Sequence, residues 1–171
     1  GGLDLSIAAM MAVCGVTAAR LMEGQGEAFG IVAVAMILLL GAGLGAINGL
    51  TVVITRIPDI VVTLSFFFIW EGVALLILSS PGGGVADWLR DLILGTIGGA
   101  FIPGELSQWA PKALLLLIIT LAAVWIPVRR SRLGRWIYAI GSDSQAAFRS
   151  GVPVGRTKIA SYAVAPAVRA T

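Results

Sequence analysis

The chain has 171 residues, of which 58% are hydrophobic and only 12% are charged, and its mean hydropathy is +0.96. A soluble domain needs far more charge to cover its surface, so this composition excludes an ordinary soluble protein and favours a chain that lies in a membrane. The net charge is +3, no histidine is present and the single cysteine is Cys14, which excludes an internal disulfide framework and a Cys/His metal site.

Long apolar segments recur along the chain, and a helix needs about 20 such residues to cross a bilayer. The expected spans, in chain order, are 5–19, 29–54, 60–78, 113–128 and a last one that begins at 158 and continues to 168. The predicted fold class is an all-α, polytopic bundle of transmembrane helices. Because the chain begins without Met and stops within a hydrophobic stretch, we expect 1–171 to be a fragment, part of a single domain with about four to five of its spans.

Positive charge is concentrated in one connection, 129–158, which carries seven basic residues against the single acid Asp143. Lys and Arg are retained on the cytoplasmic side of a membrane, so we place this loop inside the cell and interpret it as a topology signal, not a nucleic-acid site. Counting back through the spans places the longest connection, 79–112, outside. There, Trp88 and Trp109 are expected to anchor a short helix at the interface.

Within the basic loop, 142–150 has the pattern of a short capped helix. Ser142 as N-cap and Gln145 three residues later form a capping box, and Asp143 favours the positive helix start. Gly151 is a natural stop, because glycine readily adopts the left-handed conformation. About eight helical residues are too few to be stable alone, so packing must hold the helix. The apolar surface available for this packing is formed by Ala146, Ala147 and Phe148.

Two interpretations of this helix stay open. It either packs on its own membrane domain or the lipid surface, as basic amphipathic segments often do, or it docks a soluble cytoplasmic subunit.

The second span contains a row of glycines at Gly41, Gly45 and Gly49. This spacing of i, i+4 and i+8 lines one helix face and lets another backbone approach closely. Plain packing inside the subunit is the favoured interpretation, and the alternative is a face that lines a translocation path or a subunit interface. Asn48 adds a polar group at lipid depth that must find a hydrogen-bond partner.

Two acidic residues are poorly suited to a membrane, namely Asp4 and Glu71. Asp4 precedes the first span, where a carboxylate can bind free N–H groups, and we favour this role over a substrate site. Glu71 lies within the third span, where it either faces a pathway or is a protonated carboxyl bonded to a neighbour.

The chain shows no motif of an enzyme. Segment 151–157 is one residue short of a phosphate loop, has Arg156 where lysine is needed and follows no strand. No nucleophile–base pair and no metal set accompany it. We therefore expect neither an enzyme nor a cofactor bound by this chain.

Three segments together carry a family pattern. They are Gly1-Gly2-Leu3-Asp4-Leu5-Ser6, then Gly45-Ala46-Ile47-Asn48-Gly49 followed by Arg56 to Leu64, and then Gly134 to Gly141 with Ala146-Ala147 and Gly151-Val152. In this order they resemble the permease subunits of ATP-binding-cassette (ABC) importers for monosaccharides, the ribose, xylose and galactose branch. The chain departs from the family at Ser142-Asp143, where Gly-Asn is usual, and at Glu71, where a basic residue is common.

The resemblance implies a multi-pass permease of the inner membrane that passes a sugar. It also implies four kinds of partner: a cytoplasmic ATP-binding subunit, which would hold the ATP, an extracytoplasmic solute-binding protein, a second permease copy or homologue, and membrane lipid. The ATPase-coupling residues that it implies are Gly141, Ser142, Asp143, Gln145, Ala146, Ala147, Phe148 and Gly151. The alternatives are a permease for another solute, such as branched-chain amino acids, or a membrane assembly protein that transports nothing.

Overall fold

The computed structural model describes residues 4–80, 82–96 and 111–169, with only the backbone for 165–169. Across these residues the regular elements are helices, and β-pairing is limited to one isolated bridge between Thr96 and Pro111. The predicted all-α fold class is confirmed. The expectations for residues 1–3 and Trp109 lie outside the described residues.

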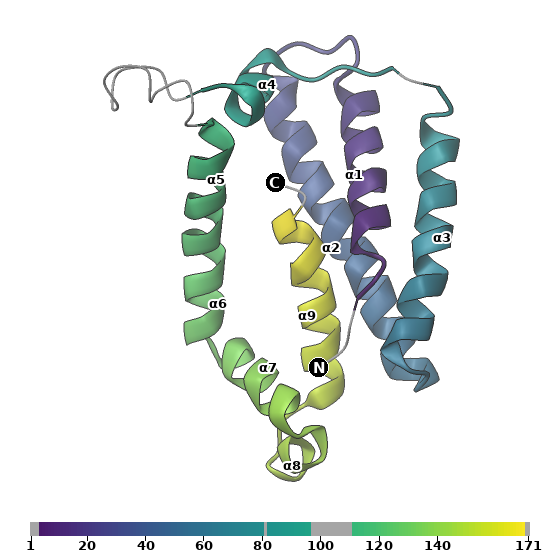
Figure 1. The fold of residues 1–171 in the computed structure, drawn as a ribbon, viewed down its shortest axis with the longest axis vertical. Helices are drawn as coiled ribbons and strands as arrows, with labels where there is room; N and C mark the ends of the chain where they lie inside the picture. Colours follow the sequence, from purple (N-terminus) through teal and green to yellow (C-terminus); the bar gives the residue numbers. More distant parts are fainter. Residues whose placement is uncertain (1–3, 81, 97–110, 170–171) are drawn as a thin grey trace.

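Most helices run along the long axis of the molecule (Figure 1). Their bounds are α1 Ile7–Met22, α2 Phe29–Thr55, α3 Asp59–Ile77, α4 Asp87–Leu94, α5 Lys112–Thr120, the π-helical turn η2 Leu121–Trp125, α6 Ile126–Arg130, α7 Arg132–Ser142, α8 Ser144–Arg149 and α9 Val154–Arg169. Each expected span corresponds to a helix, or to the continuous rod of α5, η2 and α6. The short helix expected in the 79–112 connection is α4.

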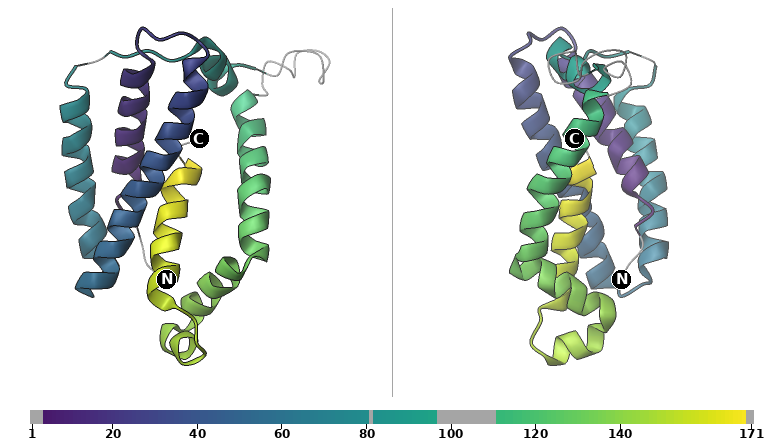
Figure 2. Two further views of the ribbon diagram at one scale, coloured as in Figure 1. Left: turned by 180° about the vertical axis from the view of Figure 1, so that it is seen from behind. Right: turned by 60° about the vertical axis from the view of Figure 1, so that its left-hand side comes forward.

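Three helical stretches are long and apolar enough to cross a membrane: α2, α3 and the rod 112–130. The helices α1 and α9 are shorter, with 16 residues each. They pack with α2 and α3 into one bundle, whereas the rod stands apart from it (Figures 1 and 2). In agreement with this, none of the rod's span is buried in the described structure.

The π-helical turn in the rod has an identifiable cause. Pro127 lies in the first turn of α6 and has no N–H to donate to the preceding turn. Its ring would also crowd the carbonyl of Ala123, four residues earlier, so the helix widens over Leu121–Trp125. The span continues through the proline without a break.

The centre of the bundle is an apolar cluster contributed by three helices. Met10 and Cys14 of α1 pack against Ile37 and Leu44 of α2 and Ala74 of α3. These side chains are all at least nine-tenths buried. On either side of this centre, the short helix α4 lies at one end of the molecule and the short helix α8 at the other (Figure 1).

The end with α4 is closed by a contact with the start of α2. Trp88 donates its indole N–H to the carbonyl of Glu27 at 3.1 Å, and the backbone N–H of Asp87 donates to the Glu27 carboxylate at 3.1 Å. A Cβ on Gly30 would lie 2.9 Å from both Ala86 and Trp88, so the absence of a side chain there allows the close approach.

Candidate functional site

A polar junction joins α1, α2 and α3 inside the apolar bundle. The Asn48 amide of α2 donates to the hydroxyl of Ser6 at 2.6 Å, and its carbonyl oxygen accepts from the Trp70 indole of α3 at 3.2 Å. Asn48 and Ser6 are completely buried. Asn48 was expected to need a hydrogen-bond partner, and it has two, one from each neighbouring helix.

Asp4 extends this junction ahead of α1. Its Oδ1 accepts from both the backbone N–H of Ser6, at 2.9 Å, and the Ser6 hydroxyl, at 2.6 Å. Ser6 occupies the N-cap position of α1 but makes no capping bond with its own side chain. The carboxylate thus holds the residue at which the helix starts. Its other oxygen is buried and has no hydrogen-bond partner among the described residues.

The glycine row of α2 is buried, and at Gly49 it faces α9. A Cβ on Gly49 would lie 2.9 Å from the Cβ of Tyr162 and 3.0 Å from the Cα of Ile159. Gly41 and Gly45 are buried on the same helix, whereas Gly43 has open space where a side chain would be. The geometry at Gly49 is that of helix packing within the subunit.

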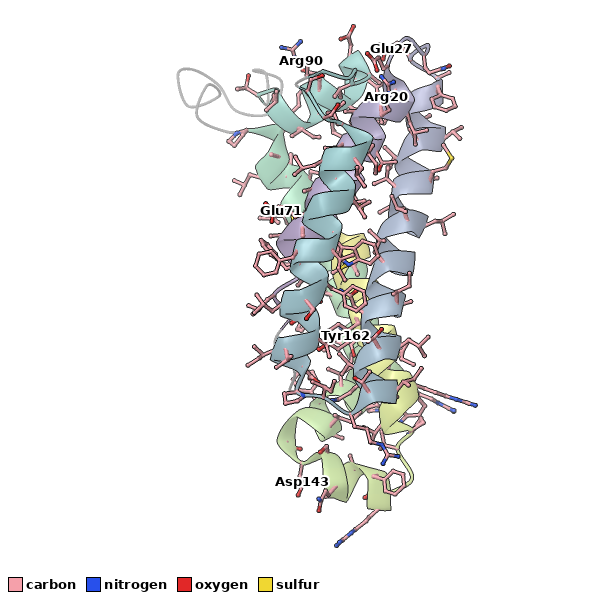
Figure 3. All side chains as sticks on the ribbon, turned by 90° about the vertical axis from the view of Figure 1, so that its right-hand side faces the viewer. Arg20, Glu27, Glu71, Arg90, Asp143 and Tyr162 are labelled. Carbon is pink, nitrogen blue, oxygen red and sulfur yellow. The ribbon has the colours of Figure 1, made fainter. Side chains whose placement is uncertain are left out.

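Glu71 is exposed on α3 and lies on the outer side of that helix (Figure 3). Within the part of the chain that the structure describes, its carboxylate makes no hydrogen bond and no ion pair. The structure therefore does not bring Glu71 together with Asp4 or with the polar junction.

The basic loop forms two helices, and the predicted cap is wrong by one residue. Ser142 is the last residue of α7, and its hydroxyl donates to the carbonyl of Ala139 at 2.9 Å. The N-cap of α8 is Asp143, whose Oδ1 accepts from the backbone N–H groups of Gln145, at 2.8 Å, and Ala146, at 3.0 Å. The preceding helix engages the serine, so the capping box on Ser142 does not form.

The other end of α8 has the predicted glycine stop. Gly151 has a φ of +82°, in the left-handed region. The backbone N–H of Val152 donates to the carbonyl of Ala147 at 3.0 Å, which is the long hydrogen bond of a Schellman motif. This six-residue helix is thus capped at its start by the Asp143 side chain and at its end by the turn at Gly151.

The apolar residues of α8 divide between two environments. Ala147 is buried, whereas Phe148 is 71% exposed and lines a surface groove of about 380 Å³ with Gln145 and Val154. Gly141, Ala146 and Gly151 are exposed as well. The phenyl ring of Phe148 is therefore exposed on a helix that is capped at both ends.

Sequence reasoning missed a cavity of about 440 Å³ between α7–α8 and the bundle. Its wall includes the ion pair between Lys158 of α9 and Asp59 of α3, with Nζ and Oδ1 3.5 Å apart, and the buried Tyr162. Residues 59 and 158 are far apart in the chain and belong to no periodic pattern, so only the packing of α9 brings them together. No group of three potential metal ligands occurs among the described residues.

The profile of one protein family, described as branched-chain amino acid transport system / permease component, matches residues 1–168. The chain belongs to this family. It is therefore a multi-pass protein of the inner membrane, and the resemblance to permeases of ABC importers is confirmed. No solved structure is significantly similar to the chain.

Three similar curated proteins are described as permeases. The chain is 33% identical to a probable ABC transporter permease protein of Sinorhizobium fredii over 95% of its own length and 45% of the relative's. It is 30% identical to the ribose import permease of Escherichia coli (95% and 49%) and 32% identical to the D-allose transport system permease of the same species (90% and 44%). The chain thus spans about half the length of the curated relatives it matches.

Proposed function

We propose that this chain is part of the transmembrane permease subunit of an ABC importer that moves a monosaccharide, similar to ribose, xylose or galactose, across the inner membrane. The observation that carries the proposal is α8, a helix capped at both ends that presents Phe148 beyond the spans. In this proposal a partner ATPase binds ATP and docks on α8, and the chain itself performs no chemistry on the sugar.

The connections of α8 support a mechanical role. After α8 the chain enters α9 at Val154, and α9 makes its most extensive contact with α2, including the close approach at Gly49. A displacement of α8 by the ATPase would therefore reach α9 and α2 directly. Because packed helices rearrange between discrete arrangements, such a shift can switch the side of the membrane to which the pathway opens.

The remaining partners follow from the same proposal. An extracytoplasmic solute-binding protein would deliver the sugar at the end that carries α4, and a second permease copy or homologue would complete the pathway in the lipid. Membrane lipid surrounds the spans, and we propose no nucleic-acid partner. The coupling segment is 141–151, within a cytoplasmic loop 129–158, and the extracytoplasmic loop is 79–112.

The test uses the complete importer, with its ATPase and binding protein, reconstituted in vesicles. We expect Phe148→Asp to weaken the affinity of the permease for the ATPase by about thirtyfold, the effect of losing a central interface residue, and thereby to lower sugar-stimulated ATP hydrolysis. Phe148→Leu, which keeps an apolar side chain on α8, should retain most of the activity. Equal activity of the Asp and Leu variants would contradict the docking role.

Uptake of labelled solutes by the same vesicles tests the substrate class. A panel of ribose, xylose, galactose and branched-chain amino acids is required, because the family's description names the amino acids. We expect ATP-dependent uptake of a monosaccharide. Uptake of branched-chain amino acids alone would show that the importer is an amino-acid permease and not a sugar permease. The absence of all uptake would favour a membrane assembly protein.

A further inference from the structure

Four arginines lie within seven residues of sequence where the rod ends and α7 begins. Arg129 and Arg130 are the last residues of α6, and Arg132 and Arg135 lie in the first four residues of α7. All four side chains are exposed. We call these four residues the basic corner.

Local structure fixes the backbone on which these arginines stand. The Ser131 hydroxyl accepts from the backbone N–H of Gly134 at 3.2 Å and donates to the carbonyl of Val128 at 2.7 Å, which ties the start of α7 to the end of α6. A Cβ on Gly134 would overlap the Val128 carbonyl oxygen, so only glycine allows this approach. The guanidinium of Arg135 donates to the carbonyl of Arg130 at 3.5 Å.

The basic corner has no acidic partner within the described residues. The ion pairs found among the described residues are Arg20–Glu23, Lys112–Asp91 and Lys158–Asp59, and none of them includes an arginine of the basic corner. The nearest acid along the sequence is Asp143, whose Oδ1 is engaged in capping α8. Four exposed positive charges within seven residues, with no described acidic side chain paired to them, create a local positive potential that attracts a negatively charged group from outside the chain.

The position of the corner indicates which anion this is. The rod 112–130 has 19 residues, and at about 1.5 Å per residue it nearly matches a hydrocarbon core of about 30 Å. Arg129 and Arg130 then emerge at the level of the lipid phosphates. Trp125, one turn earlier, is 49% exposed, as expected of an aromatic residue at the membrane interface.

We propose that the basic corner binds the phosphate groups of anionic phospholipids in the cytoplasmic leaflet. Guanidinium groups form paired hydrogen bonds with phosphate, which favours arginine at such a site. Because α7 leads directly from the corner to α8, the bound lipid fixes the depth at which α8 stands below the membrane. The inference rests on the inside placement of 129–158 in the proposed function, but on neither the sugar nor the ATPase.

The ATPase is a less suitable partner for this surface. Figure 1 shows α7 running from the end of the rod towards α8, so α8 lies farther from the spans than the basic corner does. A soluble subunit seated on α8 approaches from that far side. The corner faces the membrane end of the same segment.

The test is lipid binding by the full-length permease, purified in detergent and titrated with phosphatidylglycerol or phosphatidylcholine, with bound lipids counted by native mass spectrometry. Arg129→Gln/Arg130→Gln should weaken phosphatidylglycerol binding by about fivefold for each charge removed, whereas phosphatidylcholine binding stays unchanged. The matched control is Arg20→Gln/Arg90→Gln, which removes two positive charges at the opposite end of the molecule (Figure 3) and should bind like the wild type.

A second variant, Arg129→Lys/Arg130→Lys, keeps the charge and should retain most of the preference for phosphatidylglycerol. The proposal is overturned if the glutamine variant and the control bind phosphatidylglycerol equally, or if the wild type binds both lipids equally. It is also overturned if the glutamine variant loses the ATPase in pure phosphatidylcholine nanodiscs, since the corner would then be a protein contact. Sugar uptake is not measured in these assays, so the outcome is independent of the substrate.

Discussion

At the scale of single residues, Asn48 shows how a membrane bundle uses one polar side chain. The amide has no water to bind inside the bundle, so its partners must come from neighbouring helices. Ser6 and Trp70 satisfy it from α1 and α3, which fixes the register of three helices at one depth. Such interhelical hydrogen bonds contribute about 0.6–2 kcal/mol each, less than the large gas-phase value would suggest. Specificity of packing is therefore their main contribution.

Gly49 and Gly43 allow the packing of α2 on α9 to be tested on a single helix. We expect Gly49→Ala to lower the free energy of unfolding by about 1–3 kcal/mol, because the new methyl group would overlap Tyr162 and Ile159. Gly43→Ala should be neutral or stabilising by up to about 1 kcal/mol, since its methyl group meets open space and alanine favours a helix. Thermal unfolding of the full-length permease in detergent measures both. Equal melting temperatures of the Gly49→Ala and Gly43→Ala variants would contradict the packing of Gly49 against α9.

At the scale of elements, the basic loop shows what a sequence pattern can and cannot specify. Gly151 was predicted to end α8 and does so, because a positive φ is a local property that glycine alone adopts without strain. The N-cap of α8 is Asp143, one residue later than the predicted Ser142. Ser142 and Asp143 are both good caps, and the choice depends on where α7 ends: Ser142 is its last residue, and the Ser142 hydroxyl donates to the carbonyl of Ala139.

The corrected cap gives a prediction at this scale. Asp143→Ala should destabilise α8 by about 1 kcal/mol, because two backbone N–H groups lose their acceptor. Ser142→Ala should have little effect on α8, since the serine hydroxyl binds only a carbonyl of α7. Hydrogen exchange at the amide of Ala146 measures the difference and should be about fivefold faster in the Asp143 variant. Faster exchange in the Ser142 variant instead would restore the capping box.

At the scale of the whole molecule, the orientation in the membrane follows from charge and is open to direct measurement. In a full-length permease that is expressed without its ATPase and has Cys14→Ser and no other cysteine, Phe148→Cys should react with a membrane-impermeant maleimide only in inside-out vesicles. Gln25→Cys, in the turn between α1 and α2, should react only from the outside of intact cells. Both positions are exposed, so access depends on the side of the membrane. Labelling of both from one side would contradict the topology.

The sequence by itself determined the class of protein, the order and approximate bounds of the helices and the family. These features depend on local composition: apolar length selects the spans, a glycine ends α8, and the residues of each motif lie close together in the chain. It also indicated that Asn48 needs a partner, since burial of an unpaired amide in lipid is too costly.

Only the tertiary structure decided which residues meet. The pairing of Lys158 with Asp59, the seating of Gly49 on Tyr162 and the outward position of Glu71 depend on how α9 and α3 are placed beside α2. The close approach of the start of α7 to the end of α6 likewise depends on the absence of a side chain at Gly134. The reason is physical: contacts between distant segments are set by the packing of whole helices, and no periodicity within one segment encodes the rotation or depth of its neighbour.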